Sequence, residues 1–203
     1  MSNILLVLSS PRGEESNSTK VARSLVANLE AKSHGSNTVV RDVATHKLPH
    51  IDNDFISATR GQPVSLSVAQ TEAVKLSDTL LAEVNAADVI VIGASMLNFG
   101  VPSTLKSWVD YLAVPGKTFS YSENGPKGHL TGKKVYLVQA TAGVYSQGPG
   151  QAADFLSPYL RQVLGFMGLT DFEVIHVEGT AFGPEAAEKA MNQAFDRAAA
   201  LAA

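Results

Sequence analysis

A stretch rich in hydroxyl side chains follows the first apolar run of the chain, Ile4-Leu5-Leu6-Val7-Leu8. Residues 9–19 read Ser-Ser-Pro-Arg-Gly-Glu-Glu-Ser-Asn-Ser-Thr and lead into a helical pattern. Hydroxyls and unpaired backbone N–H groups at a helix start can surround a phosphate, whose charge the helix dipole favours. The stretch is therefore a candidate phosphate site. The alternative is that Ser16 or Ser18 is simply an N-cap residue.

Several common catalytic or nucleotide-binding motifs are missing from residues 9–19. The stretch has no Gly-Lys-Ser/Thr triplet, which argues against ATP, and no Gly-x-Gly-x-x-Gly, which argues against NAD bound in the Rossmann manner. Ser9 and Ser10 follow a predicted strand but lack the Gly-x-Ser-x-Gly elbow of an α/β-hydrolase. The hydroxyls are thus better suited to binding than to nucleophilic attack.

Two later segments also have residue types suited to a ligand. Residues 94–102, Ala-Ser-Met-Leu-Asn-Phe-Gly-Val-Pro, mix apolar and amide side chains after the most apolar run of the chain. Residues 140–150 begin with Ala-Thr-Ala-Gly, and small residues let the backbone approach a planar ligand closely. In each case the alternative is an ordinary turn, with Met96 and Phe99 packed into the core.

Other candidate groups favour structural roles. His46, His50, Asp52 and Asp54 could be mistaken for a metal site, but no apolar frame surrounds them and we expect a solvated loop without metal. Trp108 lies at helical spacing from Leu105 and Leu112, so core or dimer packing is expected.

Apolar runs alternate with helical patterns along the whole chain. Strands are expected at 4–8, 38–43, 89–92, 135–138 and 172–177, and helices at 21–29, 69–84, 102–112, 155–166 and 184–201. Five such units predict an α/β fold, a three-layer, doubly wound, five-stranded parallel sheet with helices on both faces. Ligands of such sheets bind at the carboxyl ends of the strands, near the point where strand order reverses. The three candidate segments follow the first, third and fourth strands and should meet there.

Composition narrows the class of protein. The 203 residues, 45% apolar and 17% charged, suit one globular domain over 1–203. The net charge of −3 and the scattered Lys and Arg residues argue against nucleic acid and membrane partners. There is no cysteine, and the start of the chain lacks the basic and long apolar regions of a signal peptide, so a cytoplasmic protein is expected.

Several separated motifs together resemble the FMN-dependent NADH azoreductases, which also act as NAD(P)H:quinone oxidoreductases. The motifs, in chain order, are Met96-Leu97-Asn98-Phe99, Thr118-Phe119-Ser120-Tyr121, Glu123-Asn124-Gly125-Pro126, Leu130-Thr131-Gly132-Lys133-Lys134 and Glu178-Gly179-Thr180-Ala181-Phe182-Gly183-Pro184-Glu185. The resemblance covers essentially the whole chain and is more specific than any single loop.

The resemblance implies a flavodoxin-like fold and a homodimer with two FMN sites at the subunit interface, where NADH or NADPH and the acceptor take turns on the flavin. It assigns the FMN phosphate to Ser10, Ser16, Asn17 and Ser18, the ring and ribityl chain to Met96, Leu97, Asn98 and Phe99, and the pyrimidine edge to Ala140, Thr141, Ala142 and Gly143. It assigns the walls of the acceptor pocket, some from the other subunit, to Phe119, Tyr121 and Phe166.

The implied activity is a two-electron, ping-pong transfer from NAD(P)H to small aromatic acceptors, quinones and azo compounds. Because the flavin carries the redox chemistry, no catalytic side chain is required. Arg60 is a candidate contact for the nicotinamide nucleotide. Leu97, Ala140 and Ala142 depart from the residues common in relatives, and Ala142 is tolerable unless its position needs a positive φ. The alternative function is a flavodoxin-type electron carrier or flavin-binding module without an organic substrate.

Overall fold

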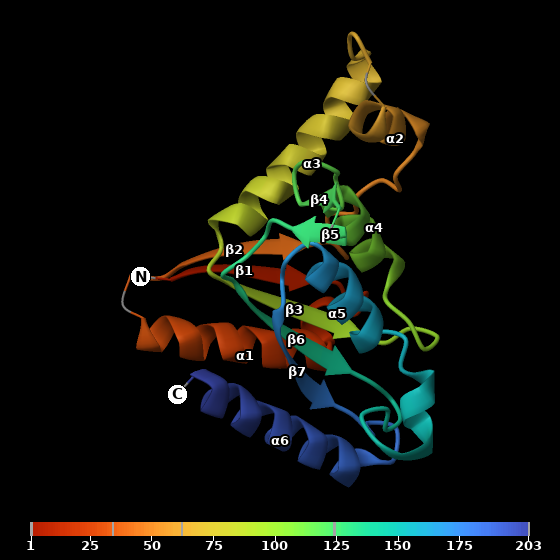
Figure 1. The fold of residues 1–203 in the computed structure, drawn as a ribbon. Helices are drawn as coiled ribbons and strands as arrows, with labels where there is room; N and C mark the ends of the chain where they lie inside the picture. Colours follow the sequence, from red (N-terminus) through yellow and green to blue (C-terminus); the bar gives the residue numbers. More distant parts are fainter. Residues whose placement is uncertain (1, 34, 62, 124, 203) are drawn as a thin grey trace.

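The computed structural model describes residues 2–33, 35–61, 63–123 and 125–202, and it has the predicted doubly wound architecture (Figure 1). Five parallel strands form one sheet in the order β2-β1-β3-β6-β7. Their bounds are Asn3–Leu8 for β1, Asn37–Asp42 for β2, Val89–Ser95 for β3, Lys134–Ala140 for β6 and Asp171–Val177 for β7. The central strands β1, β3 and β6 are buried along nearly their whole length, as expected when helices cover both faces.

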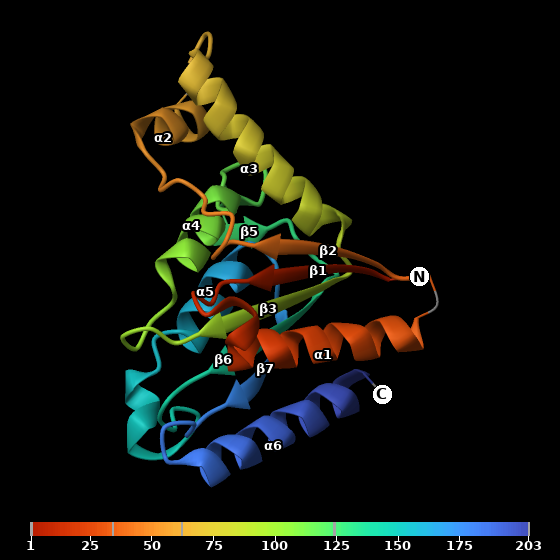
Figure 2. The same cartoon turned by 180° about the vertical axis from the view of Figure 1, so that it is seen from behind.

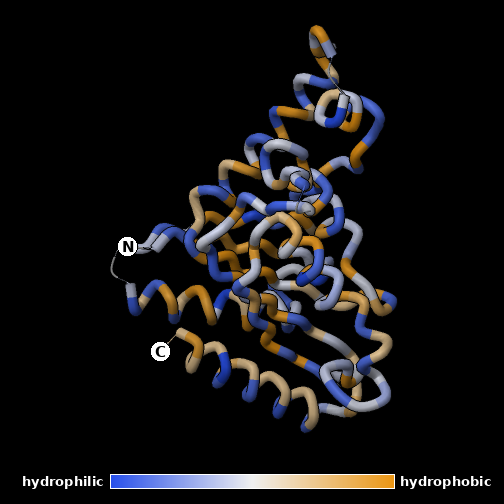
Figure 3. Tube along the Cα trace, viewed as in Figure 1, coloured by the Kyte–Doolittle hydropathy of each residue, from blue (hydrophilic) through white to orange (hydrophobic). Residues whose placement is uncertain are grey.

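Two layers of helices enclose the sheet. One face is covered by α1 (Asn17–Lys32) and α6 (Pro184–Ala202), and the other by α3 (Val68–Ala86), α4 (Ser103–Leu112) and α5 (Ser157–Phe166) (Figures 1 and 2). Figure 3 shows apolar residues concentrated in the central strands, whereas α1 and α6 alternate between polar and apolar residues. Trp108 of α4 is fully buried in the core, which is one of the two packing roles expected for it. Within the described residues, no helix is both long and apolar enough to cross a membrane.

The long connection after β2 contains a helix that the sequence pattern did not predict. This helix, α2 (Asn53–Arg60), begins where the Asp52 carboxylate accepts the N–H of Phe55 at 3.0 Å. It packs on α3, and the two together project beyond the sheet (Figures 1 and 2). The prediction of five helices was therefore one helix short.

The excursion between α4 and β6 contains a small antiparallel hairpin of β4 (Phe119–Ser122) and β5 (Gly125–Gly128). It docks against the end of α5, where the N–H of Leu130 donates to the carbonyl of Met167 at 2.9 Å. A Cβ at Gly128 would lie only 2.2 Å from the Gly168 nitrogen, so only glycine permits this approach. The hairpin thereby carries Phe119 and Tyr121 to the end of α5. Two short 3-10 helices, Gly13–Glu15 and Gly148–Ala153, complete the described elements.

Gly93 of β3 sets how closely α1 lies on the sheet. A Cβ there would lie 3.1 Å from Leu8 Cδ2 and 3.3 Å from both the Ala22 Cβ and the Ser18 carbonyl oxygen. The carbonyl of Gly93 also accepts the N–H and the hydroxyl of Ser9, at 3.1 and 3.0 Å. Gly93 thus positions both the end of β1 and the start of α1.

Replacing Gly93 by valine is predicted to lower the free energy of unfolding by about 1–3 kcal/mol, because the added methyl groups overpack this contact. Gly165→Ala is the control, since a Cβ at Gly165 in α5 meets no atom within 4 Å. That change should stabilise the protein by about 0.5–1 kcal/mol, the usual gain over glycine in a helix. Urea unfolding of both variants measures the difference, and a Gly93→Val protein as stable as wild type would show that the close approach is unnecessary.

Candidate active site

Four serine hydroxyls meet where the carboxyl ends of β1 and β3 lie side by side. The Ser16 Oγ lies 3.0 Å from the Ser18 Oγ and 3.2 Å from the Ser95 Oγ. Ser95 Oγ also lies 3.3 Å from the Ser18 Oγ and donates to the Ser10 Oγ at 3.2 Å. Ser10, Ser16 and Ser18 are almost fully buried. We call Ser10, Ser16, Ser18 and Ser95 the hydroxyl cluster.

The hydroxyl cluster lies at the start of α1. Ser16 has the extended backbone of an N-cap residue, yet its hydroxyl makes no capping hydrogen bond. The first bond along α1 runs from the Lys20 N–H to the Ser16 carbonyl, so the N–H groups of Asn17, Ser18 and Thr19 precede it. Hydroxyls, leading N–H groups and the helix dipole together are the groups that bind an anion such as a phosphate at a helix start. The N-cap alternative therefore holds for the Ser16 backbone but does not explain its hydroxyl.

The acidic residues before α1 are paired with cations of α1 itself. Glu14 accepts from the Arg23 guanidinium at 2.5 Å, and Glu15 accepts from the Lys20 ammonium at 3.1 Å. Both pairs are exposed, so each contributes little to stability. Their effect is to reduce the negative potential beside the hydroxyl cluster.

The loop after β3 is a tight turn with two left-handed residues that are not glycine. Asn98 has φ 48° and Phe99 has φ 71°, and the backbone groups of Leu97 and Gly100 bond each other at 3.0 and 3.1 Å. Two successive positive φ angles are those of a type I′ turn, and non-glycine residues in this region are strained. The turn leaves Phe99 52% exposed rather than packed in the core. Backbone strain of this kind is concentrated at active sites and ligand sites.

Contacts from neighbouring segments fix this turn. The N–H of Met96 donates to the carbonyl of Ala140 at 2.9 Å, and the N–H of Phe155 donates to the carbonyl of Phe99 at 3.0 Å. The rings of Phe99 and Tyr145 meet edge to face, with centroids 6.2 Å apart. Phe155, expected inside a helix, instead precedes α5 and is 62% exposed. The loops after β3 and β6 and the start of α5 therefore form one surface.

Within the described residues, three successive carbonyls of the loop after β6 are hydrogen-bonded, whereas three successive N–H groups are not. The carbonyls of residues 141, 142 and 143 accept from the Thr180 hydroxyl, the Ala181 N–H and the Gly179 N–H, at 3.0, 3.0 and 2.9 Å. In the part of the chain that the structure describes, no partner is present for the N–H groups of Ala142, Gly143 and Val144. These three successive donors suit the carbonyl or anionic edge of a planar ligand.

Two predicted residues of this loop contribute shape rather than polar groups. Thr141 is buried, its N–H donates to the Val177 carbonyl and its hydroxyl to the Gly143 carbonyl. Ala140 is buried as well. Among the non-glycine residues described, only Asn98 and Phe99 have positive φ, so alanine at 142 carries no backbone penalty.

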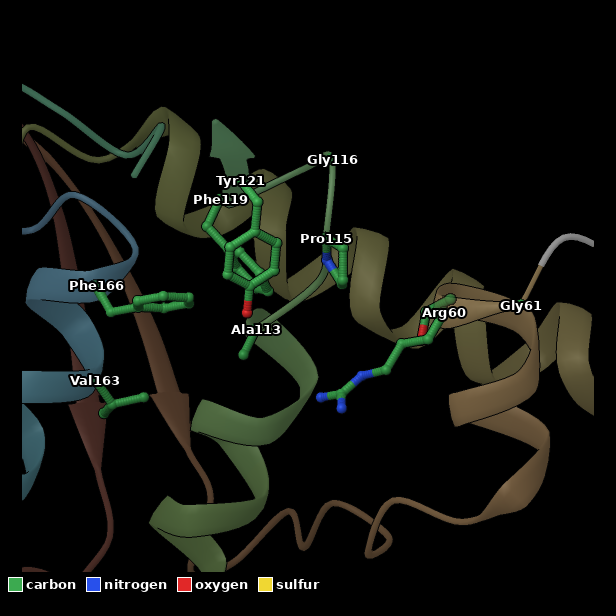
Figure 4. A pocket seen from close by; sticks show the side chains of 10 residues that line it. Arg60, Gly61, Ala113, Pro115, Gly116, Phe119, Tyr121, Val163 and Phe166 are labelled. Atoms are coloured by element: carbon green, nitrogen blue, oxygen red, sulfur yellow. The ribbon is translucent and has the colours of Figure 1, made fainter. Parts of the chain in front are cut away.

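A separate cavity of about 630 Å³ contains the three aromatic residues predicted to wall an acceptor pocket (Figure 4). The ring centroid of Phe119 lies 4.5 Å from that of Phe166 and 5.6 Å from that of Tyr121. Arg60, at the end of α2, extends toward these rings (Figure 4). The cavity thus offers apolar walls and one cation.

The cavity lies at the opposite end of α4 and α5 from the hydroxyl cluster and the turn. Ser103 and Ser157 begin these helices beside the turn, whereas Ala113 and Phe166 line the cavity at their other ends. Each helix has 10 residues and so spans about 15 Å. None of the twelve residues predicted to bind the cofactor lines the cavity. One chain does not bring the two regions together.

Comparison with known proteins places the chain in a family. Residues 2–202 match the family described as having a flavodoxin-like fold. The chain belongs to the flavodoxin-like family. It is 52% identical over 191 residues to an FMN-dependent NADH:quinone oxidoreductase of Agrobacterium fabrum, with 94% of this chain and 93% of the relative covered.

Other relatives of this flavodoxin-like chain agree. An FMN-dependent NADH:quinone oxidoreductase of Rhizobium johnstonii is 50% identical, with 100% of this chain and 98% of the relative covered. Among solved structures, the azoreductase from Bacillus anthracis str. Sterne superposes with a TM-score of 0.91 at 31% identity, covering 100% of this chain and 99% of the other. The expected family and fold are confirmed.

Two residues of the flavodoxin-like site were missed by the sequence prediction. Ser95 joins the hydroxyl cluster, and Tyr145 packs against Phe99. Ser95 had a usable signal, because a polar residue ending a buried strand next to β1 must face the same crevice. Tyr145 had none beyond its place in the loop after β6.

Two of the four residues considered as a metal site, His50 and Asp52, have other partners. The His50 Nδ1 lies 3.3 Å from the Ser107 hydroxyl, and Asp52 caps α2. No group of three or more His, Asp or Glu side chains within the described ranges is placed to hold a metal ion.

Asp154 holds the start of α5 beside the site. Its Oδ1 accepts the N–H groups of Leu156 and Ser157 at 2.9 and 3.2 Å, and its Oδ2 accepts the Ser157 hydroxyl at 2.6 Å. Burial by itself would raise the pKa of Asp154, but these hydrogen bonds to the ionised form outweigh burial and lower it.

Because the pKa of Asp154 is lower in the folded than in the unfolded chain, its stabilisation is complete above the ordinary aspartate pKa and is lost as the pH falls through the folded value. Asp154→Asn should cost about 1–2 kcal/mol at neutral pH. The gap from wild type should narrow as the solution becomes more acidic. Urea unfolding across a pH series measures it, and a gap that stays constant with pH would contradict the assignment.

Proposed function

We propose that this chain is an FMN-dependent oxidoreductase that transfers two electrons from NADH or NADPH to quinones and aromatic azo compounds. The observation that carries the proposal is the convergence of the hydroxyl cluster, the strained turn and three unpaired N–H groups at one edge of the sheet. The printed names of the relatives, FMN-dependent NADH:quinone oxidoreductase and azoreductase, support the same activity.

The chemistry of the donor set fits FMN. The hydroxyl cluster and the leading N–H groups of α1 suit the phosphate, and the turn at residues 97–100 offers an apolar surface to a flat ring. The N–H groups of Ala142 to Val144 suit the O2 and N1 acceptors of its pyrimidine edge. When bound, FMN would accept a hydride from NAD(P)H and pass two electrons to the acceptor.

We assign FMN binding to Ser10, Ser16, Asn17, Ser18, Met96, Leu97, Asn98, Phe99, Ala140, Thr141, Ala142 and Gly143. Ser95 joins them through the hydroxyl cluster. In this assignment Thr141 and Ala140 support the loop, and the unpaired N–H groups next to them stabilise negative charge at the pyrimidine edge. NAD(P)H and the acceptor would be bound in turn at this one site.

The protein is a homodimer in this proposal, with each acceptor pocket shared between subunits. Reacting atoms must approach to about 3–3.5 Å. The aromatic cavity of Phe119, Tyr121 and Phe166 lies about 15 Å from the turn in the same chain, the length of α4. A partner's cavity can wall the site only if two copies associate with these regions face to face. Arg60 would then lie near the phosphates of the nicotinamide nucleotide.

The remaining parts of the proposal follow from this chemistry. In this proposal residues 1–203 act as one FMN-binding domain, and the use of NAD(P)H, a cytoplasmic reductant, supports a cytoplasmic enzyme. The alternative of an electron carrier is less well supported, because a carrier needs a strongly charged docking face and the chain carries a net charge of only −3.

Steady-state kinetics with NADH and menadione tests the proposed reaction. The expected result is continuous NADH oxidation that depends on bound FMN, with parallel double-reciprocal plots because the two substrates share one site in turn. A protein that binds FMN but supports no continuous oxidation with any small quinone would instead fit the carrier.

The hydroxyl cluster is predicted to bind the phosphate. Ser16→Ala combined with Ser18→Ala should raise the Kd for FMN about tenfold or more, equal to about 1.4 kcal/mol, by removing two donors. The Kd for riboflavin, which has no phosphate, should change little. Fluorescence titration of the apoprotein measures both constants, and equal losses for the two flavins would contradict a phosphate site.

Mixing two impaired variants, assayed at an FMN concentration near the wild-type Kd, tests the shared site. At that concentration the Ser16→Ala/Ser18→Ala protein is mostly without FMN because its phosphate site is weakened, and a Tyr121→Ala/Phe166→Ala protein lacks the aromatic wall. After mixing and subunit exchange, about a quarter of wild-type activity should return, because half of random dimers are mixed and each has one intact site. Activity no higher than the mean of the two parents would contradict a site shared between subunits.

A further inference from the structure

Glu178, the first residue after β7, is bonded through both carboxylate oxygens to the loop after β6. Its Oε2 accepts the N–H groups of Tyr145 and Ser146 at 2.9 and 3.0 Å, and its Oε1 accepts the Ser146 hydroxyl. The side chain is only half-buried, yet all of these partners come from one short segment. Glu178 therefore acts on the backbone of that loop rather than on another side-chain network.

The residues after Glu178 hold the same loop from the same side. Gly179, Thr180 and Ala181 donate to the carbonyls of residues 143, 141 and 142. We call residues 178–181 the strap. The strap donates hydrogen bonds to three successive carbonyls, those of residues 141–143. Through Glu178 it also accepts hydrogen bonds from two successive N–H groups, those of Tyr145 and Ser146.

This pattern divides the N–H groups of the loop into two sets. Those of Tyr145 and Ser146 are used by Glu178, whereas those of Ala142, Gly143 and Val144 have no partner among the described residues. A loop can present three adjacent donors to a ligand only if its peptide planes are held against rotation. The strap holds these planes on their carbonyl side, and Glu178 fixes the residues that follow.

Glu178 also links this loop to the turn after β3. The backbone that it holds carries the Tyr145 ring, which meets Phe99 edge to face. A Cβ at Gly143 would lie 3.2 Å from the Tyr145 Cε2, so Gly143 and this ring are already closely packed. Movement of Tyr145 would therefore disturb both the unpaired N–H groups and the strained turn.

We propose, on the basis of the proposed function, that Glu178 is a positioning residue that holds the loop after β6 so that the N–H groups of Ala142, Gly143 and Val144 bind the pyrimidine edge of FMN.

The ionisation of Glu178 agrees with this role. Burial alone would raise the pKa of Glu178, but the Ser146 hydroxyl, the two N–H groups and nearby His176 outweigh burial and lower it. An ionised carboxylate only accepts hydrogen bonds, which matches its three donors. Glu178 is thus suited to holding the loop and not to donating a proton to a substrate.

Titration of the apoproteins with FMN, followed by flavin fluorescence, tests the role without measuring activity. Glu178→Ala should raise the Kd at least tenfold, because the loop loses three hydrogen bonds that order it. Glu178→Gln keeps an acceptor oxygen of the same reach and should stay within about threefold of wild type. The matched control is Glu173→Gln on β7, whose carboxylate pairs with Arg197 and Lys134 away from the loop, and it should leave the Kd unchanged.

Two results would overturn the role of Glu178: an alanine variant that binds FMN as tightly as wild type, or a glutamine variant that loses as much affinity as alanine. Failure of the wild-type protein to bind FMN would overturn the proposed function instead. Thermal unfolding of each apoprotein checks folding. If Glu178→Ala does not fold, Ser146→Ala removes one of the three donors, and its Kd should rise about two- to fivefold; an unchanged value for Ser146→Ala would overturn the role as well.

Discussion

The pairing of β1 with β3 is the constraint on which the site depends. The two strands lie side by side in parallel, with Leu8 opposite Gly93, although β2 separates them in the sequence. The chain leaves β1 toward α1 on one face and leaves β3 toward α4 on the other. A crevice must therefore open between the two loops. The bonds from Ser9 to the Gly93 carbonyl join its two sides.

Backbone groups, more than side chains, give this crevice its chemistry. The strap takes the carbonyls of the loop after β6, and α1 begins with N–H groups that have no helical partner. Both arrangements leave N–H donors without a protein partner among the described residues, and such donors are available to a ligand. Such a division suits the proposed flavin, which needs binding, orientation and electrostatic support from the protein rather than a catalytic side chain.

Much of the fold could be predicted because central parallel strands are buried on both faces and appear as continuous apolar runs, such as Ile4 to Leu8. The helix α2 was missed because it has only eight residues and one buried side chain, Phe55. The β4–β5 hairpin was missed because it is rich in Gly, Pro and Ser and has no apolar alternation typical of strands. Its position depends on contacts with the end of α5.

The candidate site could be predicted only as a set of loops. The motifs indicated residues 9–19, 94–102 and 140–150. The position of Ser95 at the end of a buried strand indicates the same edge of the sheet, but its contacts with Ser16 and Ser18 depend on the register of β1 and β3. Phe155 has helical spacing to Tyr159, yet its N–H bonds Phe99 and α5 starts at Ser157. Which N–H groups remain unpaired depends on contacts between segments about 35 residues apart.

The most direct test of FMN-dependent electron transfer is the visible spectrum of the purified protein, recorded under anaerobic conditions before and after adding NADH and then menadione. We expect a bound flavin absorbance that NADH bleaches and that one equivalent of menadione restores, with both steps seen on the same sample. A protein that neither carries flavin nor binds added FMN, or whose bound FMN is not reduced by NADH or NADPH, would contradict the proposed electron transfer.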